Sequence, residues 1–287
     1  MAMKGGVLTL CTIGASDRLT QGPGMTRIIA IANQKGGVAK TTTVASIGAA
    51  LAELGQRVLV VDLDPQACLT FSLGFDPETL EFSMHDVLLG RISASMAVLK
   101  TDEAVALLPA SIDLAGTEAQ LLTRTGREFA LRTALEDLGG EYDTVLLDCS
   151  PSLGVLTINA LTAADEVLIP LQCETLSHRG VGQLLDTIAD VRRITNRNLV
   201  VLGVLPTLFD SRTNHSRAVL ADINDRYGLD ILGPAIPRSI RFAEAPAAGR
   251  SVLASGGRFR GAEAYRQLAR GLLDGTATTT NPLIGAQ

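Results

Sequence analysis

The chain has 287 residues, 46% of them hydrophobic, a formal net charge of −5 and a mean hydropathy of +0.26. This composition predicts a large core, in either one α/β domain or two small ones. No run of 18 apolar residues occurs, which argues against a membrane span. The four cysteines lack CxxC spacing, which argues against a disulfide framework or a metal centre and fits a reducing cytosol.

Residues 1–24 do not form a signal peptide, because one early lysine and a short mixed apolar run are followed by Gly, Ser and Pro. Met25 lies just before the first predicted strand, as an alternative start would. We expect a disordered extension or a mis-assigned start at 1–24, a single domain at 25–274 and a flexible tail at 275–287.

A glycine-rich turn follows an apolar run at 28–32 and precedes an Ala-rich helical pattern from Thr43. Strand, turn and helix in this order predict a phosphate-binding loop, in which backbone N–H groups and the helix N-terminus bind an anion. Lys40 is placed to reach the β- and γ-phosphates, and the Thr41 hydroxyl to hold Mg²⁺. We expect nucleotide contacts from Lys35, Gly36, Gly37, Val38, Ala39, Lys40, Thr41 and Thr42.

Ala39 occupies the position where the generic loop has its last glycine. At positive φ an alanine costs roughly 1 kcal/mol, and at negative φ it costs little. If φ is positive here, Ala39→Gly is predicted to tighten nucleotide binding by up to about tenfold.

Two acidic residues follow the next apolar run, at 57–62, which predicts a buried parallel strand. Asp62 ends this strand and Asp64 comes two residues later. Ligands bind at the carboxyl ends of strands in open α/β sheets. One carboxylate can therefore serve the Mg²⁺ shell and the other can orient an attacking water. The alternative, an Asp that caps a loop, fits Asp62 better than Asp64.

The middle of the chain alternates between helical and strand patterns. A third acidic residue, Asp148, ends an apolar run, which is the Walker B pattern of an Asp that reaches Mg²⁺ through water. The alternation predicts a doubly wound, mainly parallel sheet with helices on both faces. The expected helices are 83–89, 128–138 and 182–195, and the further strands are 105–109, 142–148, 165–171 and 199–205.

The last part of the chain, 201–287, has a charge of +3, with ten arginines and no lysine, while the remainder sums to −8. Such asymmetry hints at an anionic partner. On charge alone, ordinary surface arginines are the favoured interpretation.

Several segments together resemble the ParA/MinD superfamily of ATPases with a deviant Walker A loop, over about residues 26–273. The two lysines of KGGVAKTT at 35–42 carry this resemblance most strongly. The other similar segments, in chain order, are DLDPQ at 62–66, LLPASIDLAG at 107–116, DCSPSLG at 148–154, PLQCE at 170–174, FDSRTN at 209–214, IPRSIRFAEAP at 236–246 and GAEAY at 261–265.

The resemblance implies a Mg²⁺-dependent ATPase of the ParA/Soj type that acts in chromosome or plasmid partitioning. ATP would close two subunits into a sandwich homodimer, in which Lys35 and Glu174 face the partner's nucleotide. Asp64 would be the hydrolytic residue, with Lys35 and Lys40 also catalytic. The implied metal residues are Thr41, Asp62 and Asp148, and Pro206 and Pro237 would lie beside the adenine.

The resemblance also implies non-specific binding of double-stranded DNA by the ATP dimer, through arginines at the positions of Arg212 and Arg241. Hydrolysis, stimulated by a ParB-like partner, would release the DNA. The protein would then be cytoplasmic and nucleoid-associated, without a membrane partner. Further arginines that extend the basic surface would be Arg217, Arg238, Arg258 and Arg260.

Three alternatives stay open. A MinD-like membrane-surface ATPase needs a basic amphipathic C-terminal helix, but no basic residue follows Arg270. A related ATPase can position another cargo, such as a division site, a carboxysome or a chemoreceptor array. A module that holds nucleotide without hydrolysing it is opposed by Asp64 and left open by Ala39.

Overall fold

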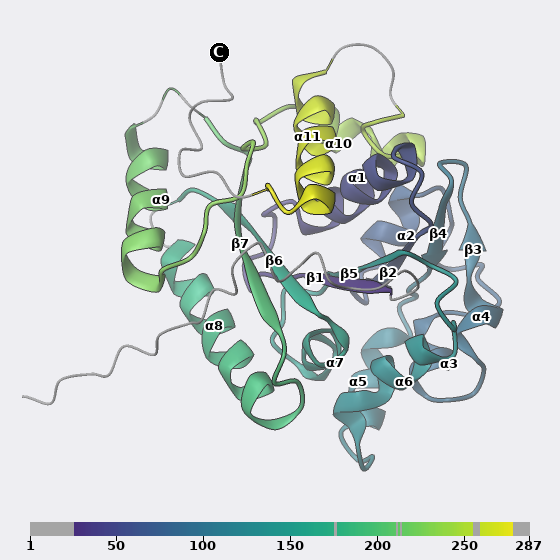
Figure 1. Cartoon of the computed structure of the whole chain (residues 1–287). Coiled ribbons are helices and arrows are strands. Elements are labelled where there is room, and N and C mark those ends of the chain that lie inside the picture. Colours follow the sequence, from purple (N-terminus) through teal and green to yellow (C-terminus); the bar gives the residue numbers. More distant parts are fainter. Residues whose placement is uncertain (1–25, 175–176, 211, 213, 255–258, 278–287) are drawn as a thin grey trace, which may run out of the picture.

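A seven-stranded sheet forms the centre of the computed structural model, which describes residues 26–174, 177–210, 212, 214–254 and 259–277 (Figure 1). The strand order is β3-β4-β2-β5-β1-β6-β7, and only β3 is antiparallel to its neighbour. The strands are β1 (Arg27–Ile31), β2 (Val58–Leu63), β3 (Leu99–Lys100), β4 (Val105–Leu108), β5 (Thr144–Cys149), β6 (Glu166–Gln172) and β7 (Val200–Thr207).

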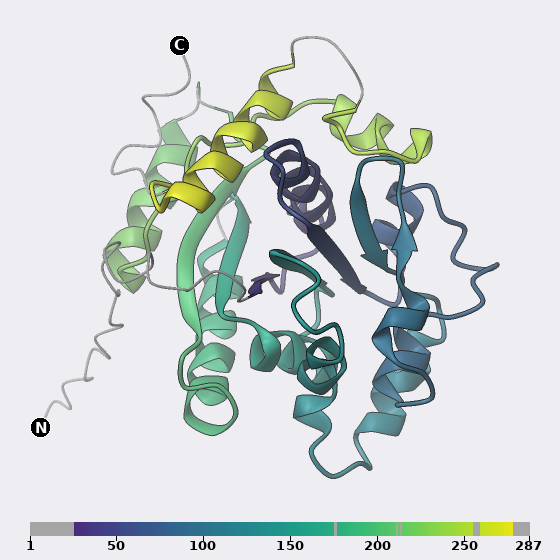
Figure 2. The same ribbon diagram turned by 45° about the vertical axis from the view of Figure 1, so that its right-hand side comes forward.

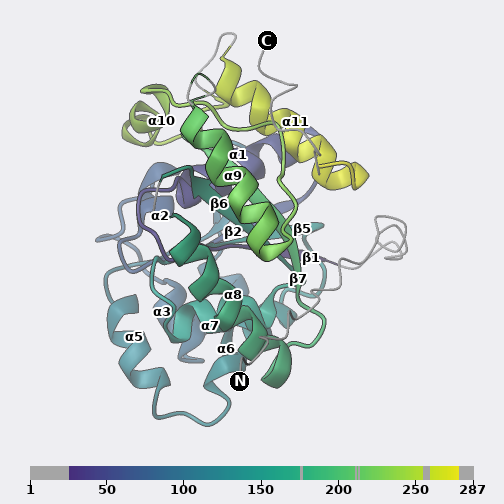
Figure 3. The same cartoon turned by 90° about the vertical axis from the view of Figure 1, so that its left-hand side faces the viewer.

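Helices cover both faces of this sheet, which confirms the predicted fold class (Figures 1 and 2). One face carries α1 (Lys40–Glu53), α2 (Cys68–Ser72), α10 (Arg241–Glu244), the turn η3 (Pro246–Ala248) and α11 (Arg260–Asp274). The other carries α3 (Met84–Leu88), α4 (Ala94–Ala97), α5 (Leu114–Leu121), the turn η2 (Arg127–Phe129), α6 (Ala130–Glu136), α7 (Val155–Ala163), α8 (Ser177–Ile194) and α9 (Asn214–Tyr227). Figure 3 shows α9 beside α8, where the Tyr227 hydroxyl donates to the His178 carbonyl.

The central strands are apolar on both sides because each side faces a separate hydrophobic core. In β2, Leu59 and Val61 pack into the core with α7 and α8, and Val58 and Val60 pack into the core with α1 and α11. Successive side chains of a strand point to opposite faces. A strand that is buried on both faces therefore has a nearly continuous apolar sequence, and such a sequence is what predicted these strands.

Some predicted boundaries were wrong. Helix α1 begins at Lys40 rather than Thr43, and α8 begins at Ser177 rather than 182. Strand β7 runs on to Thr207, two residues beyond its predicted end. The helix expected from 128 begins at Ala130, because residues 127–129 form a 3-10 turn after Gly126, whose φ is 69°.

The predicted extension at 1–24 and the tail from 278 onward lie outside the described residues. Ala277 is buried, and its carbonyl accepts a hydrogen bond of 3.0 Å from the Gly233 N–H. Within the part of the chain that the structure describes, no helix combines the length and the apolar character needed to cross a bilayer.

Candidate functional site

The predicted site residues come together where the parallel strands end. The register of β2 on β5 sets Asp62 beside Asp148, and β1 sets Ile31 on the other side of Asp148. The loop that follows β1 and the two acidic strand ends are therefore neighbours, as expected for an open α/β sheet.

Two polar side chains anchor the loop between β1 and α1. The Asn33 amide donates to the Pro170 carbonyl over 2.7 Å, and its oxygen accepts the Lys35 N–H over 3.0 Å. The buried Thr207 hydroxyl donates to the Val38 carbonyl over 2.9 Å. These bonds tie the loop to the ends of β6 and β7. Neither anchor was predicted, although Asn33 is a polar residue directly after an apolar strand.

The loop backbone leaves the start of α1 open. Gly37 and Ala39 have φ of 73° and 64°, both in the left-handed region. Ala39 is the N-cap of α1, and no side chain accepts a hydrogen bond there. The first backbone N–H groups of the helix consequently face the loop without a side-chain cap, which makes them available to an anion.

Ala39→Gly is expected to raise the free energy of unfolding by up to roughly 1 kcal/mol, because glycine adopts positive φ without strain. The strain exists before any nucleotide binds, so its relief is shared by the free and bound states. Nucleotide affinity should then rise by less than the tenfold upper limit. Thermal unfolding should shift upward by up to about 2–4 °C.

The control for this change is Ala104→Gly, because Ala104 also has positive φ (57°) and lies in the turn between β3 and β4. It should match the thermal shift and leave nucleotide affinity unchanged. A fall in affinity only for Ala39→Gly would contradict the strain argument.

Lys40 is buried at the centre of the site, and its Nζ donates to the Lys35 carbonyl over 3.2 Å. Burial lowers its pKa, while the charges of Asp148, Cys149 and Asp64 oppose that change. The ammonium thus lies between the loop and the acidic strand ends.

The two buried carboxylates differ in their partners. Asp62 Oδ2 accepts the Thr70 N–H over 2.9 Å and the Thr70 hydroxyl over 2.8 Å, and Oδ1 accepts the Asp64 N–H over 3.1 Å. Burial is the main cause that raises the pKa of Asp62 to about 6. Both oxygens of Asp62 therefore have partners within the protein.

Asp148 has both oxygens buried without a hydrogen-bond partner among the described residues. Burial, followed by the charge of Asp62, raises its pKa well above the usual range. The Thr41 hydroxyl, which lies near the carboxylate without the geometry of a full hydrogen bond, and the charge of Lys40 oppose this rise. Buried polar atoms in proteins are almost always paired. An unpaired carboxylate next to a threonine hydroxyl and a lysine fits a bound, hydrated cation.

Asp64 lies half-buried at the mouth of the site. Its Oδ1 accepts the Gln66 N–H over 3.0 Å, and its Oδ2 accepts no hydrogen bond within the described part of the chain. Glu174 forms an ion pair with Lys35 of the same chain, and their side chains are 53% and 36% exposed. Each of these residues is open to a ligand or a partner.

Of the two predicted prolines, Pro206 lies at the end of β7, and Pro237 lies in the segment that pairs with the chain there. The Pro206 carbonyl accepts the Ile236 N–H over 2.8 Å, and Phe209 forms a parallel bridge with Pro237. The Thr207 anchor links this pair of segments to the loop before α1.

The predicted arginines are exposed in the described residues, but their surroundings differ. Arg212 donates to both oxygens of Asp210, at 3.0 Å each, and its side chain is 87% exposed. These bonds, with a smaller contribution from Arg238, lower the pKa of Asp210 to about 2.

Arg241 lies over the Phe259 ring, 5.2 Å from its centre. The structure also describes Arg217 and Arg260, whereas Arg258 lies outside the described residues.

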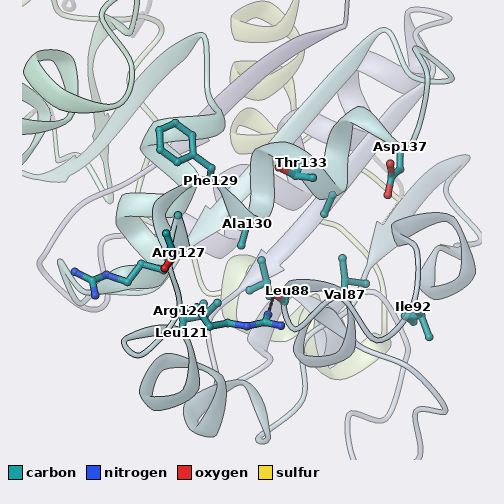
Figure 4. A pocket seen from close by; sticks show the side chains of 14 residues that line it. Val87, Leu88, Ile92, Leu121, Arg124, Arg127, Phe129, Ala130, Thr133 and Asp137 are labelled. Atoms are coloured by element: carbon teal, nitrogen blue, oxygen red, sulfur yellow. Dashed lines mark hydrogen bonds between the residues drawn. The ribbon is translucent and has the colours of Figure 1, made fainter.

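A cavity of about 380 Å³ lies away from this site, between α3 and α6 (Figure 4). Leu88 and Ala130 line it, and Arg124 donates to the Leu88 carbonyl over 3.3 Å. None of the predicted site residues lines this cavity. The candidate site is thus a set of loops at the strand ends, and not the cavity.

Comparisons with known proteins agree with the motifs. Residues 26–201 match the family described as AAA domain. The sporulation initiation inhibitor protein Soj of Bacillus subtilis is 43% identical over 86% of this chain and 98% of Soj. The chromosome partitioning protein ParA of Caulobacter vibrioides is 43% identical over 85% of this chain and 92% of ParA.

Two solved structures resemble this chain in both fold and sequence. A Mycobacterium smegmatis protein named cobyrinic acid a,c-diamide synthase, with bound ADP and magnesium, is 59% identical, has a TM-score of 0.80 and aligns over 90% of this chain and 99% of its own. The septum site-determining protein MinD of Pyrococcus horikoshii, complexed with Mg-ADP, is 27% identical, has a TM-score of 0.70 and aligns over 86% and 96%. The chain belongs to the ParA/Soj family within the ParA/MinD superfamily.

Proposed function

We propose that this chain is a Mg²⁺-dependent ATPase that partitions a chromosome or plasmid. The observation that carries the proposal is the unpaired Asp148 carboxylate beside Lys40 and the open N-terminus of α1. A triphosphate with a divalent cation satisfies all three groups at once. The Mycobacterium smegmatis protein, solved with ADP and magnesium, supports this choice of ligand.

In this proposal the backbone N–H groups of residues 36–42 and the Lys40 ammonium bind the phosphates, and Thr41 and Asp148 hold the cation. Asp62 contributes charge, since its oxygens are already bonded. Pro206 and Pro237 contact the adenine. The described residues contain no group of three or more His, Cys, Asp or Glu that would hold a metal alone. Phosphate oxygens and water would complete the Mg²⁺ shell, as is usual for this ion.

Lys35→Ala is expected to abolish ATP-dependent dimerisation, because we propose that Lys35 reaches the partner's nucleotide. Its ion pair with Glu174 is half-exposed, where such pairs are worth little, so a phosphate can replace the carboxylate. Size-exclusion chromatography with a slowly hydrolysed ATP analogue measures the dimer. Glu174→Gln, which removes the competing charge but keeps the shape and the hydrogen-bonding capacity of the side chain, should retain the dimer peak. A dimer peak for Lys35→Ala would contradict the role.

We further propose that the ATP dimer binds double-stranded DNA non-specifically on the nucleoid, in the cytoplasm. The arginines of the two subunits then form one basic strip, and hydrolysis stimulated by a ParB-like protein releases the DNA. The Soj and ParA relatives support this cargo.

The deciding experiment measures binding of wild-type protein to a random DNA duplex with ATP, with ADP and without nucleotide. Binding only with ATP is expected. Anionic lipid vesicles are tested in parallel, because a MinD-like function would give vesicle binding instead. DNA binding that is equal in all three conditions, or absent from all, would contradict the proposal.

A second candidate is cobyrinic acid a,c-diamide synthesis, which the 59% identity to the protein of that name favours. It predicts ATP-dependent formation of the a,c-diamide of cobyrinic acid. Mass spectrometry of the reaction mixture would reveal the diamide. Absence of product under conditions where ATP is hydrolysed would exclude this second candidate.

A further inference from the structure

We propose that Thr70 is a positioning residue for ATP hydrolysis, which acts on Asp64 through the buried carboxylate of Asp62. The inference rests on the proposed role of Asp64. Thr70 is fully buried in the short helix α2, and its interactions are made inside the protein. It therefore acts through other residues and does not touch the ligand.

The Thr70 hydroxyl has a fixed direction. It accepts the Ala110 N–H over 2.9 Å, and Ala110 is itself buried two residues after β4. A backbone N–H can only donate, so the hydroxyl proton is left to donate to Asp62 Oδ2, over 2.8 Å. The Thr70 N–H donates to the same oxygen over 2.9 Å. Two donors from one residue thus fix the plane of the Asp62 carboxylate.

The orientation of the Asp62 carboxylate in turn fixes the backbone of Asp64. Its other oxygen accepts the Asp64 N–H over 3.1 Å. The Asp64 carbonyl in turn accepts the Ala67 N–H over 2.8 Å, and Ala67, with φ of 51°, is the N-cap of α2. The backbone of Asp64 is consequently held on both sides by α2, directly at its carbonyl and through Asp62 at its N–H.

This arrangement also explains why a carboxylate can be fully buried at position 62. All its described partners are donors, and two of the three come from Thr70. Removal of the hydroxyl would leave the Ala110 N–H unpaired and allow the Asp62 carboxylate to rotate. Displacement of a positioned group by about 1 Å can lower a rate by about 100-fold.

The test compares Thr70→Val, which keeps the shape and removes the hydroxyl, with Thr70→Ser, which keeps the hydroxyl. Thr70→Val should lower kcat by about 10- to 100-fold, with nucleotide affinity and ATP-dependent dimerisation within about twofold of wild type. Thr70→Ser should restore kcat to within about threefold. Thr117→Val is the matched control, because Thr117 is equally buried but hydrogen-bonds His85 and Asp113 in another layer. It should leave kcat unchanged.

A double-mutant cycle separates positioning from general destabilisation. In an Asp64→Ala background, Thr70→Val should cause no further loss of kcat, because both act on one group. A further 10-fold loss, no rescue by Ser, or a normal kcat for Thr70→Val would overturn the proposal. If the Val variant does not fold, Thr70→Cys, with its weaker S–H donor, should give an intermediate kcat, and a wild-type value would overturn it. Normal turnover of Asp64→Ala alone would instead show that the proposed function of Asp64 has failed.

Discussion

Asp64→Ala is expected to lower ATP turnover by at least about 100-fold, while nucleotide binding stays within a few-fold of wild type. Phosphoryl transfer depends mainly on the placement of groups, and a side chain that positions or deprotonates the nucleophile contributes about 10²- to 10⁴-fold. Asp64 has one oxygen bonded to the Gln66 N–H, and the other is open. The open oxygen is the group that we propose to orient the attacking water.

The measurement is steady-state phosphate release together with binding of a labelled nucleotide. The variant should accumulate as an ATP-bound dimer, because formation of the dimer precedes the lost step. Asp76→Ala is the matched control, since Asp76 Oδ1 accepts the Glu78 N–H over 3.0 Å in the same kind of local turn. Turnover by Asp64→Ala equal to that of Asp76→Ala would exclude the assignment.

The sheet could be predicted from the sequence because each central strand is buried on both faces. Strands β2 and β5 are entirely buried, so both read as apolar runs that lead up to an Asp. Helix α7 was not predicted for a related reason. Eight of its residues are buried, so its sequence lacks the polar stripe that reveals a surface helix.

The candidate site could be predicted only where its residues lie in local motifs. The loop before α1 and the three acidic residues at strand ends are such cases. The anchors Asn33 and Thr207 bond partners 137 and 169 positions away, and no local pattern carries that information. The sequence also could not tell Asp62 from Asp148, because the difference is made by Thr70, which bonds only Asp62.

Arg241→Ala is expected to weaken ATP-dependent DNA binding by roughly 30-fold at 0.15 M salt. Arg241→Ala would lose one phosphate contact per subunit and two per dimer. Each contact contributes about −0.9 to the slope of the logarithm of the binding constant against the logarithm of the salt concentration. The slope should flatten by about two. Arg241 lies over the Phe259 ring with its side chain exposed, so its charge is held at the surface without an acidic partner among the described residues.

Arg212→Ala should have a smaller effect than Arg241→Ala, because Asp210 already offsets the Arg212 charge with two hydrogen bonds. A phosphate has to displace that carboxylate. Asp210→Asn should accordingly tighten DNA binding and make the salt slope steeper. The variant with both arginines replaced should lose at most roughly 1,000-fold, the value for four full contacts per dimer.

The measurement is a salt titration of a random duplex with each variant in the presence of ATP, and basal ATP turnover should stay near the wild-type value. Arg193→Ala is the control for an exposed, paired arginine, since Arg193 donates to Asp190 over 2.9 Å on α8. Arg132→Ala is the control for an arginine over a ring, since Arg132 lies 5.8 Å from the centre of Phe129. Phosphate contacts carry no sequence information, so all duplexes should be affected alike. If Arg241→Ala binds DNA with the same affinity and salt slope as these two controls, the basic surface lies elsewhere. The prediction that Arg212→Ala has a smaller effect than Arg241→Ala would then also be wrong.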